Sequence, residues 1–295
     1  VESAYAKGLD IRWKSKVVAA KVEDERVTLT VETPDGSYQV VADWVVDATG
    51  VNSPIRQWAG IEVSREQSPD NWCICDVRIK QPLPFERRTW LRAPFNHNLA
   101  VWNHPLPDKV WRLDYQIAPG TDISKIDATY ADALVRKHYG DSVDYEIVWF
   151  GPWAYRNMVV EKLRSGRVFL IGDAAHAFSP AGGRGGNSGM QDAENLAWQL
   201  ALVVRKQVPE SFLETYDEER RAAALLNIQL TSESMRFISP PTPQERAQRD
   251  EILVQARTDP AARQKINTGR LSSPHIYAPS ETVFNGGQSL ADRPL

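Results

Sequence analysis

The sequence predicts an α/β protein, in which a doubly wound domain carries an inserted antiparallel sheet and is followed by C-terminal helices. Two short apolar segments, Asp43–Asp47 and Val168–Ile171, have the composition of strands that are buried on both faces. Between them, residues from about 70 to 120 hold several strands rich in Trp, Pro and Arg, as expected of an antiparallel sheet inserted into an α/β unit. A glycine-rich loop and a helix over Ser188–Arg205 follow the second apolar strand.

The composition is that of a folded globular chain. The 295 residues include 42% hydrophobic and 25% charged residues, and the formal net charge is -3. These values exclude a mainly disordered chain and give no global field that would attract nucleic acid or an anionic membrane. No apolar run approaches the roughly 20 residues that span a bilayer, and the polar start is unlike a signal peptide, so we expect a cytoplasmic protein. Cys73 and Cys75 are too few for a zinc site and are expected to stay reduced.

The first part of the chain predicts a small β-structure. One segment alternates apolar and polar side chains, and Pro34-Asp35-Gly36 has the residues of a tight turn that leads into a hairpin partner. We expect these strands over Leu9–Trp13, Lys16–Glu23, Arg26–Thr33 and Ser37–Val41.

Beyond residue 70 the pattern alternates between strands and helices. The strands are expected over Trp72–Lys80, Arg88–Leu91, Leu99–Asn103, Val110–Ile117 and Tyr145–Trp149, and the helices over Ile126–Tyr139 and Glu210–Phe237. Past Pro240 the chain becomes rich in proline and charge, and Ser272–Leu295 is expected to be loop-like.

The most informative stretch is Gly166–Ala201, which predicts strand, turn, glycine-rich loop and helix. Asp173 lies at the carboxyl end of the strand, where open α/β sheets place ligands. The loop has several glycines, so its backbone N–H groups can approach a planar or anionic ligand closely. The helix N-terminus adds unpaired donors and a partial positive charge. Taken alone, such a glycine cluster also fits a loose surface loop.

This segment resembles the GD motif of the class A flavoprotein aromatic monooxygenases, the para-hydroxybenzoate hydroxylase type. The resemblance rests on many positions at fixed spacing. They are Gly172-Asp173-Ala174-Ala175-His176, Pro180, Gly182, Gly185, Asn187, Gln191-Asp192-Ala193 and Asn195-Leu196-Ala197.

The resemblance implies FAD as the cofactor and assigns a role to each matching position. Asp173 would accept a hydrogen bond from a ribityl hydroxyl, and the backbone N–H groups of Gly186 and Asn187 would donate to the pyrimidine edge of the flavin. Pro180 would sit against the reactive edge of the flavin and act in catalysis, whereas His176 is expected to be structural. The neighbouring positions expected to bind the cofactor are Gly182, Gly183 and Gly185.

A second, weaker match covers Asp43–Arg56. The family has Ala-Asp-Gly here, followed by Ser and Arg, and is expected to use the motif for both FAD and the nicotinamide cofactor. In this chain Thr49 stands where the family has aspartate, while Gly50, Ser53 and Arg56 match. We expect Thr49 and Gly50 to contact FAD. The alternative is a plain strand-to-turn segment in which Arg56 is a surface charge.

The inserted sheet carries the expected substrate contacts. In Val110–Ile117 the apolar side chains alternate with Arg112, Asp114 and Gln116. The resemblance makes this face the floor of the active site, with Arg112 facing the flavin and Asp114 facing the substrate as catalytic residues. Trp102 and His104 on the neighbouring strand are weaker substrate candidates, and a solvated polar face is the alternative.

These expectations divide the chain into four regions. They are 1–69, part of an FAD-binding domain; 70–160, a substrate domain with the antiparallel sheet; 161–205, the rest of the FAD-binding domain; and 206–295, a helical region and tail. The family begins with a strand, a glycine-rich turn and a helix that hold the ADP part of FAD. No such unit is found here, so we expect an internal portion of a longer protein without its N-terminal βαβ unit, or a shortened chain.

The resemblance implies hydroxylation of a phenolic or other aromatic small molecule, with NAD(P)H and dioxygen as co-substrates, through a C4a-hydroperoxyflavin. The aromatic substrate is not specified, and whether the protein forms a homodimer stays open. One alternative is a related FAD-dependent reductase or halogenase-like enzyme, because Ala48-Thr49-Gly50 is similar to the motif of those groups. Another is a non-enzymatic remnant that binds a partner or an aromatic ligand without flavin.

Overall fold

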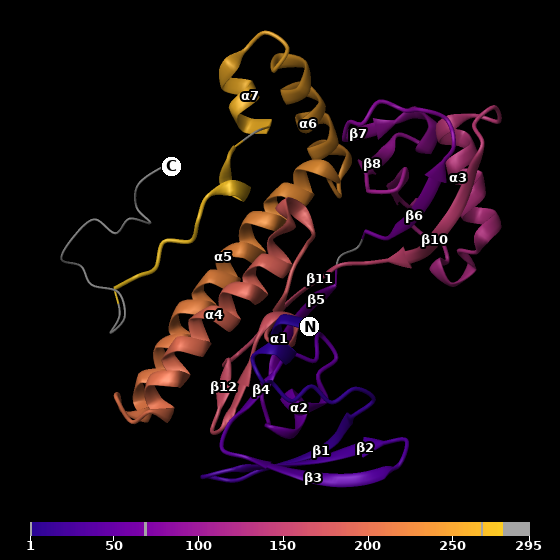
Figure 1. Cartoon of the computed structure of the whole chain (residues 1–295). Coiled ribbons are helices and arrows are strands. Elements are labelled where there is room, and N and C mark those ends of the chain that lie inside the picture. Colours follow the sequence, from indigo (N-terminus) through magenta and orange to yellow (C-terminus); the bar gives the residue numbers. More distant parts are fainter. Residues whose placement is uncertain (1, 68–69, 267, 280–295) are drawn as a thin grey trace.

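A computed structural model describes residues 2–67, 70–266 and 268–279 (Figure 1). It has the expected mixed α/β architecture, with antiparallel sheets and C-terminal helices. Two long helices run side by side through the middle of the molecule, with the first strands at one end and the inserted sheet at the other (Figure 1). The site described below lies where these parts meet.

The first β-structure is a three-stranded antiparallel sheet. Its strands are β1 (Lys16–Val22), β2 (Val27–Thr33) and β3 (Gly36–Ala42), and a short helix, α1 (Glu2–Ala6), precedes it. The prediction of a strand over Leu9–Trp13 is wrong, because this segment has no regular secondary structure. Leu9 is 58% and Trp13 66% exposed, and without a partner strand or a buried face an isolated apolar run does not form a strand.

The two buried apolar segments form neighbouring parallel strands, β4 (Val45–Asp47) and β13 (Val168–Leu170). Asp47 lies opposite Leu170, so the carboxyl ends of the two strands meet at one edge. The hairpin strand β12 (Arg164–Ser165) completes this sheet on the other side of β13. A third small sheet and a short helix lie beside it: β5 (Val63–Gln67), β11 (Arg156–Val160), β14 (His176–Ala177) and α2 (Pro54–Trp58).

The inserted region is an antiparallel sheet of five strands. In spatial order they are β10 (Tyr145–Trp153), β6 (Trp72–Ile79), β9 (Val110–Gln116), β8 (Leu99–Pro105) and β7 (Arg88–Ala93). Helix α3 (Ala128–Tyr139) packs on one face, where Leu113, Tyr115 and Leu134 belong to one buried core. Cys73 and Cys75 are free thiols in that core. The other face of the sheet therefore remains for a site.

The helices differ from the prediction at their boundaries. Helix α4 (Arg184–Val204) begins four residues before Ser188, and α5 (Glu214–Ile238) follows it antiparallel (Figure 1). Helices α6 (Pro243–Gln255) and α7 (Pro260–Ile266) were not predicted. A capping box at Thr242 and Glu245, with proline at the first helical position, starts α6, and this is a signal that the sequence contains.

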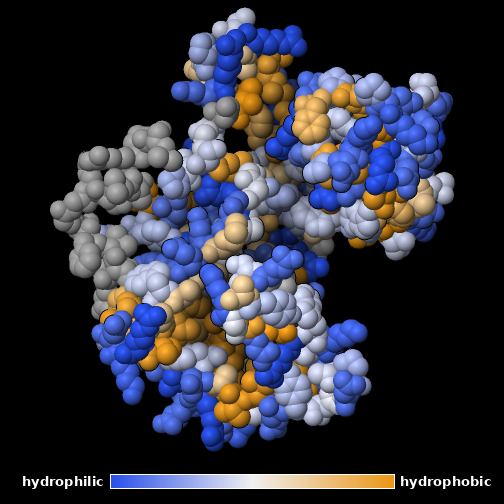
Figure 2. All heavy atoms as spheres, viewed as in Figure 1, coloured by the Kyte–Doolittle hydropathy of each residue, from blue (hydrophilic) through white to orange (hydrophobic). Residues whose placement is uncertain are grey.

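The surface is mixed, and no helix in the described ranges combines the length and apolarity that crossing a bilayer requires. Figure 2 shows hydrophobic residues gathered over the small parallel sheet and the nearby ends of the two long helices. Val46, Trp198 and Val204 are exposed in these elements. The inserted sheet presents a more hydrophilic outer surface in the same view.

The small parallel sheet depends on its buried apolar residues, because β4 and β13 are only three residues long. We predict that Leu170→Ala, at a fully buried position, lowers the free energy of unfolding by about 3 kcal/mol. The control Leu225→Ala, on the exposed side of α5, should change it by about 0.5 kcal/mol or less. Urea denaturation measures both, and equal effects of the two substitutions would contradict this prediction.

Candidate active site

The turns after β4 and β13 meet at the carboxyl edge of the small parallel sheet. After β4, the buried carboxylate of Asp47 accepts hydrogen bonds from the Thr49 N–H at 2.9 Å and from the Thr49 hydroxyl at 2.6 Å. Its second oxygen accepts a short hydrogen bond from the Ser53 hydroxyl. Both oxygens of the Asp47 carboxylate are therefore bonded within the turn. Asp47 does not replace the aspartate that the family has at the position of Thr49.

Arg56 joins the two turns. Its side chain is fully buried, so the alternative that it is a surface charge is wrong. Nη1 donates to the carbonyl of Ala174 at 2.7 Å, and Nη2 donates to the carbonyl of Val51 at 2.8 Å. One guanidinium thus ties the turn after β4 to the turn after β13, because its donors form a rigid planar fork.

Asp173 and the glycine loop leave open space at this edge. The Asp173 carboxylate is exposed and accepts no hydrogen bond from the described part of the chain. A Cβ atom added at Gly183, Gly185 or Gly186 would meet nothing within 4 Å. Backbone N–H groups without a side chain over them, next to a free carboxylate, fit a cofactor that combines a polar ring edge with hydroxyl groups.

The start of α4 corrects the predicted loop. Gly185, Gly186 and Asn187 lie in the first turn of the helix, and not in a loop before it. Gly183 is the N-cap in the left-handed region, at φ 62°, and provides no side-chain cap. The Asn187 side chain instead donates to the Gly183 carbonyl at 2.7 Å. Several N–H groups at this N-terminus consequently keep their capacity to bind an anionic or polar group.

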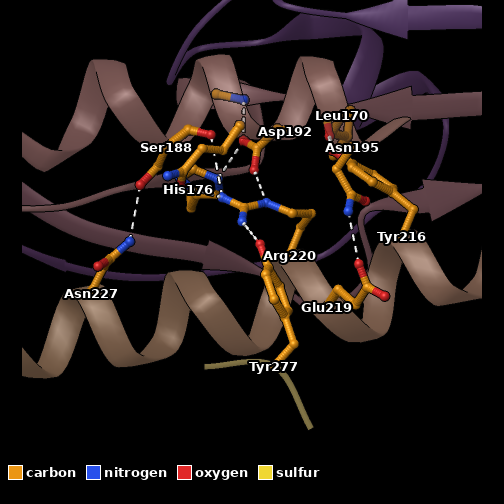
Figure 3. Close-up of polar contacts among 12 residues, drawn as sticks. Leu170, His176, Ser188, Asp192, Asn195, Tyr216, Glu219, Arg220, Asn227 and Tyr277 are labelled. Atoms are coloured by element: carbon orange, nitrogen blue, oxygen red, sulfur yellow. Dashed lines mark hydrogen bonds and ion pairs between the residues drawn. The ribbon is translucent and has the colours of Figure 1, made fainter. Parts of the chain in front are cut away.

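A buried carboxylate holds the segments around this edge together (Figure 3). One oxygen of Asp192 accepts from the Gly172 N–H at 2.9 Å and lies 2.7 Å from His176 Nε2. The other accepts from Arg220 Nε at 2.7 Å. Burial alone would raise the pKa of Asp192, but His176 and Arg220 together hold it below its usual value. His176 is 1% exposed, which agrees with its expected structural role.

The same network extends along the two long helices (Figure 3). Arg220 also donates to the hydroxyl of Tyr277 in a short hydrogen bond. Asn227 donates to the Ser188 hydroxyl at 2.9 Å, and Tyr216 donates to the Leu170 carbonyl at 2.6 Å. The sequence does not reveal these partnerships, since they join residues far apart in the chain.

A cavity of about 700 Å³ lies between the inserted sheet and the glycine loop. It brings together the predicted catalytic and substrate residues of the sheet with the first part of the predicted loop. Its lining residues are Trp72, Ile74, Arg87, Thr89, Trp102, His104, Arg112, Asp114, Trp153, Pro180, Ala181, Gly182, Gly183, Ile238 and Leu271. The other predicted cofactor contacts do not line it; they are Asp173, Gly185, Gly186, Asn187, Thr49 and Gly50.

Charged and aromatic side chains line the side of the cavity that the inserted sheet forms. Arg112 donates to both oxygens of Asp76 at 2.8 Å each, and this contact raises the pKa of the guanidinium. His104 Nε2 lies 3.3 Å from a carboxylate oxygen of Asp114. Trp72 and Trp102 stack with their ring centroids 4.7 Å apart. The arrangement offers an apolar wall next to a basic and an acidic group.

Gln116, the third polar residue of the strand, is placed differently. It is buried, and its side-chain oxygen accepts from the Ala100 N–H at 3.0 Å. Its amide nitrogen donates to Asp70 at 3.1 Å and to the Ser239 hydroxyl. The alternative of a fully solvated polar face is therefore wrong at this position, because these contacts use Gln116 to join the sheet to the end of α5.

Comparison with known proteins decides the family. Residues 1–231 match the model of an FAD-binding domain. The chain belongs to this FAD-binding family. The expected resemblance to flavin-dependent aromatic hydroxylases is confirmed, and with it FAD as the family's cofactor.

Relatives and solved structures support the same assignment. The 3-(3-hydroxy-phenyl)propionate/3-hydroxycinnamic acid hydroxylase of Burkholderia cenocepacia (strain HI2424) is 33% identical over 264 residues, covering 88% of this chain and 47% of that protein. The structure of the anhydrotetracycline hydroxylase from Streptomyces rimosus matches with a TM-score of 0.76 at 25% identity, covering 95% of this chain and 56% of that one. An aklavinone-11 hydroxylase in complex with FAD and aklavinone matches at 25% identity with a TM-score of 0.75, over 81% of this chain and 46% of that one.

The chain spans about half the length of the curated relatives it matches. The expectation that an N-terminal βαβ unit is missing stays a prediction, as does the division into four regions.

The Asp192 network yields a prediction about stability. Asp192→Asn leaves the buried Arg220 without its anion and should lower the free energy of unfolding by about 3 kcal/mol. The pKa of Asp192 is lower in the folded state than in the unfolded state. The extra stability of the wild type over the variant is therefore fully present at pH values above the unfolded-state pKa. It should shrink as pH falls below roughly 4, through the folded-state pKa.

Urea denaturation at several pH values measures this difference. Glu194→Gln, an exposed acidic position on the same helix, is the matched control and should have little effect at any pH. A difference between wild type and Asp192→Asn that stays constant below pH 4 would show that the carboxylate does not titrate as described.

Proposed function

We propose that this chain holds the flavin part of FAD at the carboxyl edge of β4 and β13. The supporting observation is the open cradle: a free carboxylate at Asp173 beside glycines whose Cβ positions are empty. Asp173 would bind the ribityl hydroxyls, and Thr49 and Gly50 would contact the cofactor from the neighbouring turn. Gly182, Gly185, Gly186 and Asn187 would offer backbone N–H groups to the flavin ring, and Gly183, whose N–H donates to the Pro180 carbonyl at 2.9 Å, would leave room for the ring.

Bound FAD would supply the redox chemistry that NAD(P)H and dioxygen require, and the residues of the chain would bind and orient the reactants. The N-terminus of α4 carries a partial positive charge, so it stabilises negative charge at the ring edge that faces it. Pro180 and the inserted sheet would enclose the reacting atoms and exclude water.

The proposed reaction is hydroxylation of a phenolic or other aromatic small molecule. The stacked Trp72 and Trp102 offer a flat apolar wall that suits an aromatic ring. Asp114, whose carboxylate lies 3.3 Å from His104 Nε2, would accept the proton of a phenolic hydroxyl. Arg112, held by Asp76, would place a positive charge near the flavin. The names of the relatives, which are hydroxylases of aromatic compounds, support this choice.

The cofactor site is tested by Asp173→Ala in the whole protein. Loss of one carboxylate hydrogen bond to the ribityl chain should weaken FAD binding by about 10- to 100-fold. Flavin fluorescence titration measures this, with Asp43→Ala at the opposite end of the β4 segment as control. Full FAD affinity in Asp173→Ala would refute the cofactor site, and no uptake of FAD by the wild type would favour a non-enzymatic protein.

The catalytic role is tested by Asp114→Asn. Phenols should stimulate NAD(P)H oxidation and become hydroxylated by the wild type, and the substitution should slow hydroxylation by about 100-fold at neutral pH. The rate should recover as pH rises towards the pKa of the phenol, because the substrate then ionises without a protein base. FAD affinity should not change.

Asp108→Asn, in the turn between β8 and β9, is the matched control. Equal rates in Asp114→Asn and the wild type would refute the role of Asp114. NAD(P)H oxidation that no phenol stimulates would favour a related flavin reductase.

A further inference from the structure

The segment after α7 returns to the candidate site. We call residues 268–277 the C-terminal strap. A short 3-10 turn, Arg270–Ser272, lies in the strap and contacts both α5 and the glycine loop. Leu271 in this turn lines the 700 Å³ cavity. It also packs against the apolar cluster that contains Trp72 and Trp102. Leu271, which directly precedes the stretch expected to be loop-like, therefore supplies one wall of the cavity.

Leu271 is seated directly on the glycine loop. Gly182 has a φ of +73°, and a Cβ atom at that position would lie 3.0 Å from the Leu271 Cβ. Such a distance is tighter than ordinary van der Waals contact, so the Leu271 side chain occupies the space beside Gly182 that a side chain at that position would need. The position of Leu271 is consequently set by the same loop that is proposed to hold the flavin.

Two arginines from the long helices anchor the strap. Arg184, at the start of α4, donates to the carbonyl of Leu271 at 2.7 Å and to that of Ser273 at 3.2 Å. Arg220 on α5 donates to the Tyr277 hydroxyl (Figure 3). Arg184 is itself oriented by Asn227, whose side-chain oxygen accepts from Nε at 2.6 Å. The strap is therefore held at Leu271, Ser273 and Tyr277, and these contacts fix the place of the Leu271 backbone at the cavity.

We propose that Leu271 is a specificity-determining residue, which limits the size of the aromatic ring system that the cavity accepts. The proposal rests on the proposed function only in taking an aromatic ligand as the occupant. Trp72 and Trp102, which stack on each other, line the cavity with apolar surface, and Leu271 and Ile238 line it from the opposite segments. Apolar pockets discriminate by size, since each added or missing carbon changes the fit of the ligand.

The test compares phenol and 1-naphthol as one-ring and two-ring probes. Isothermal titration calorimetry of the purified chain, in the presence of excess FAD, gives the dissociation constant of each. Leu271→Ala should shift the preference towards 1-naphthol by about tenfold, because it removes the carbons that meet the second ring. Leu271→Phe should shift the preference towards phenol, and the control Leu225→Ala on the outside of α5 should not change it.

An unchanged preference in both Leu271 variants would overturn the proposal, and thermal melts show whether each variant is folded. This outcome is distinct from a failure of the proposed function. FAD uptake and phenol-stimulated NAD(P)H oxidation by the wild type would still support the enzyme, while Leu271 would be excluded as its size filter. A wild-type chain that binds neither probe would overturn both the size filter and the aromatic site.

Discussion

The structure around the candidate site depends on one buried carboxylate. Asp192 has no exposed surface, and it bonds the turn at Gly172, the ring of His176 and the guanidinium of Arg220. A buried charge is stable only when partners replace the water that it loses, so these segments must stay in register. The carboxyl end of β13, the strand β14 and the two long helices are thereby held in one arrangement (Figure 3).

This rigid frame explains how an open site can be precise. Arg56 links the turns after β4 and β13 in a second place. Its guanidinium donates hydrogen bonds to backbone carbonyls, whereas the Asp192 carboxylate accepts hydrogen bonds. Among the side-chain polar atoms of Asp192, His176, Arg220 and Arg56, only Arg56 Nε is buried without a hydrogen-bond partner in the described part of the chain. Asp173 and the glycines at the start of α4 are left free at the edge between them. When the polar groups of a scaffold bond mainly to one another, the donors and acceptors at its edge remain available for a ligand.

The cavity is assembled from segments that are far apart in the chain. The inserted sheet contributes Trp102 and Asp114, the glycine loop contributes Pro180, and the C-terminal strap contributes Leu271. The first three were expected at the site from the family resemblance, which rests on local motif spacing and strand alternation. Leu271 was not expected there. Its place in the site depends on hydrogen bonds from Arg184 to the backbone carbonyls of Leu271 and Ser273, and such bonds leave no pattern in the sequence.

The sequence by itself determined the fold class, the family resemblance, the order of most strands and helices, and the residues of the glycine segment. Periodicity and fixed spacing carry that information within a few turns of chain. Only the tertiary structure decided that Arg56 is buried, that Gly185 and Gly186 belong to the helix, and that Leu9–Trp13 forms no strand. The physical reason is that burial, pairing partners and close backbone contacts are properties of segments brought together in space, and a local pattern does not specify which segments these are.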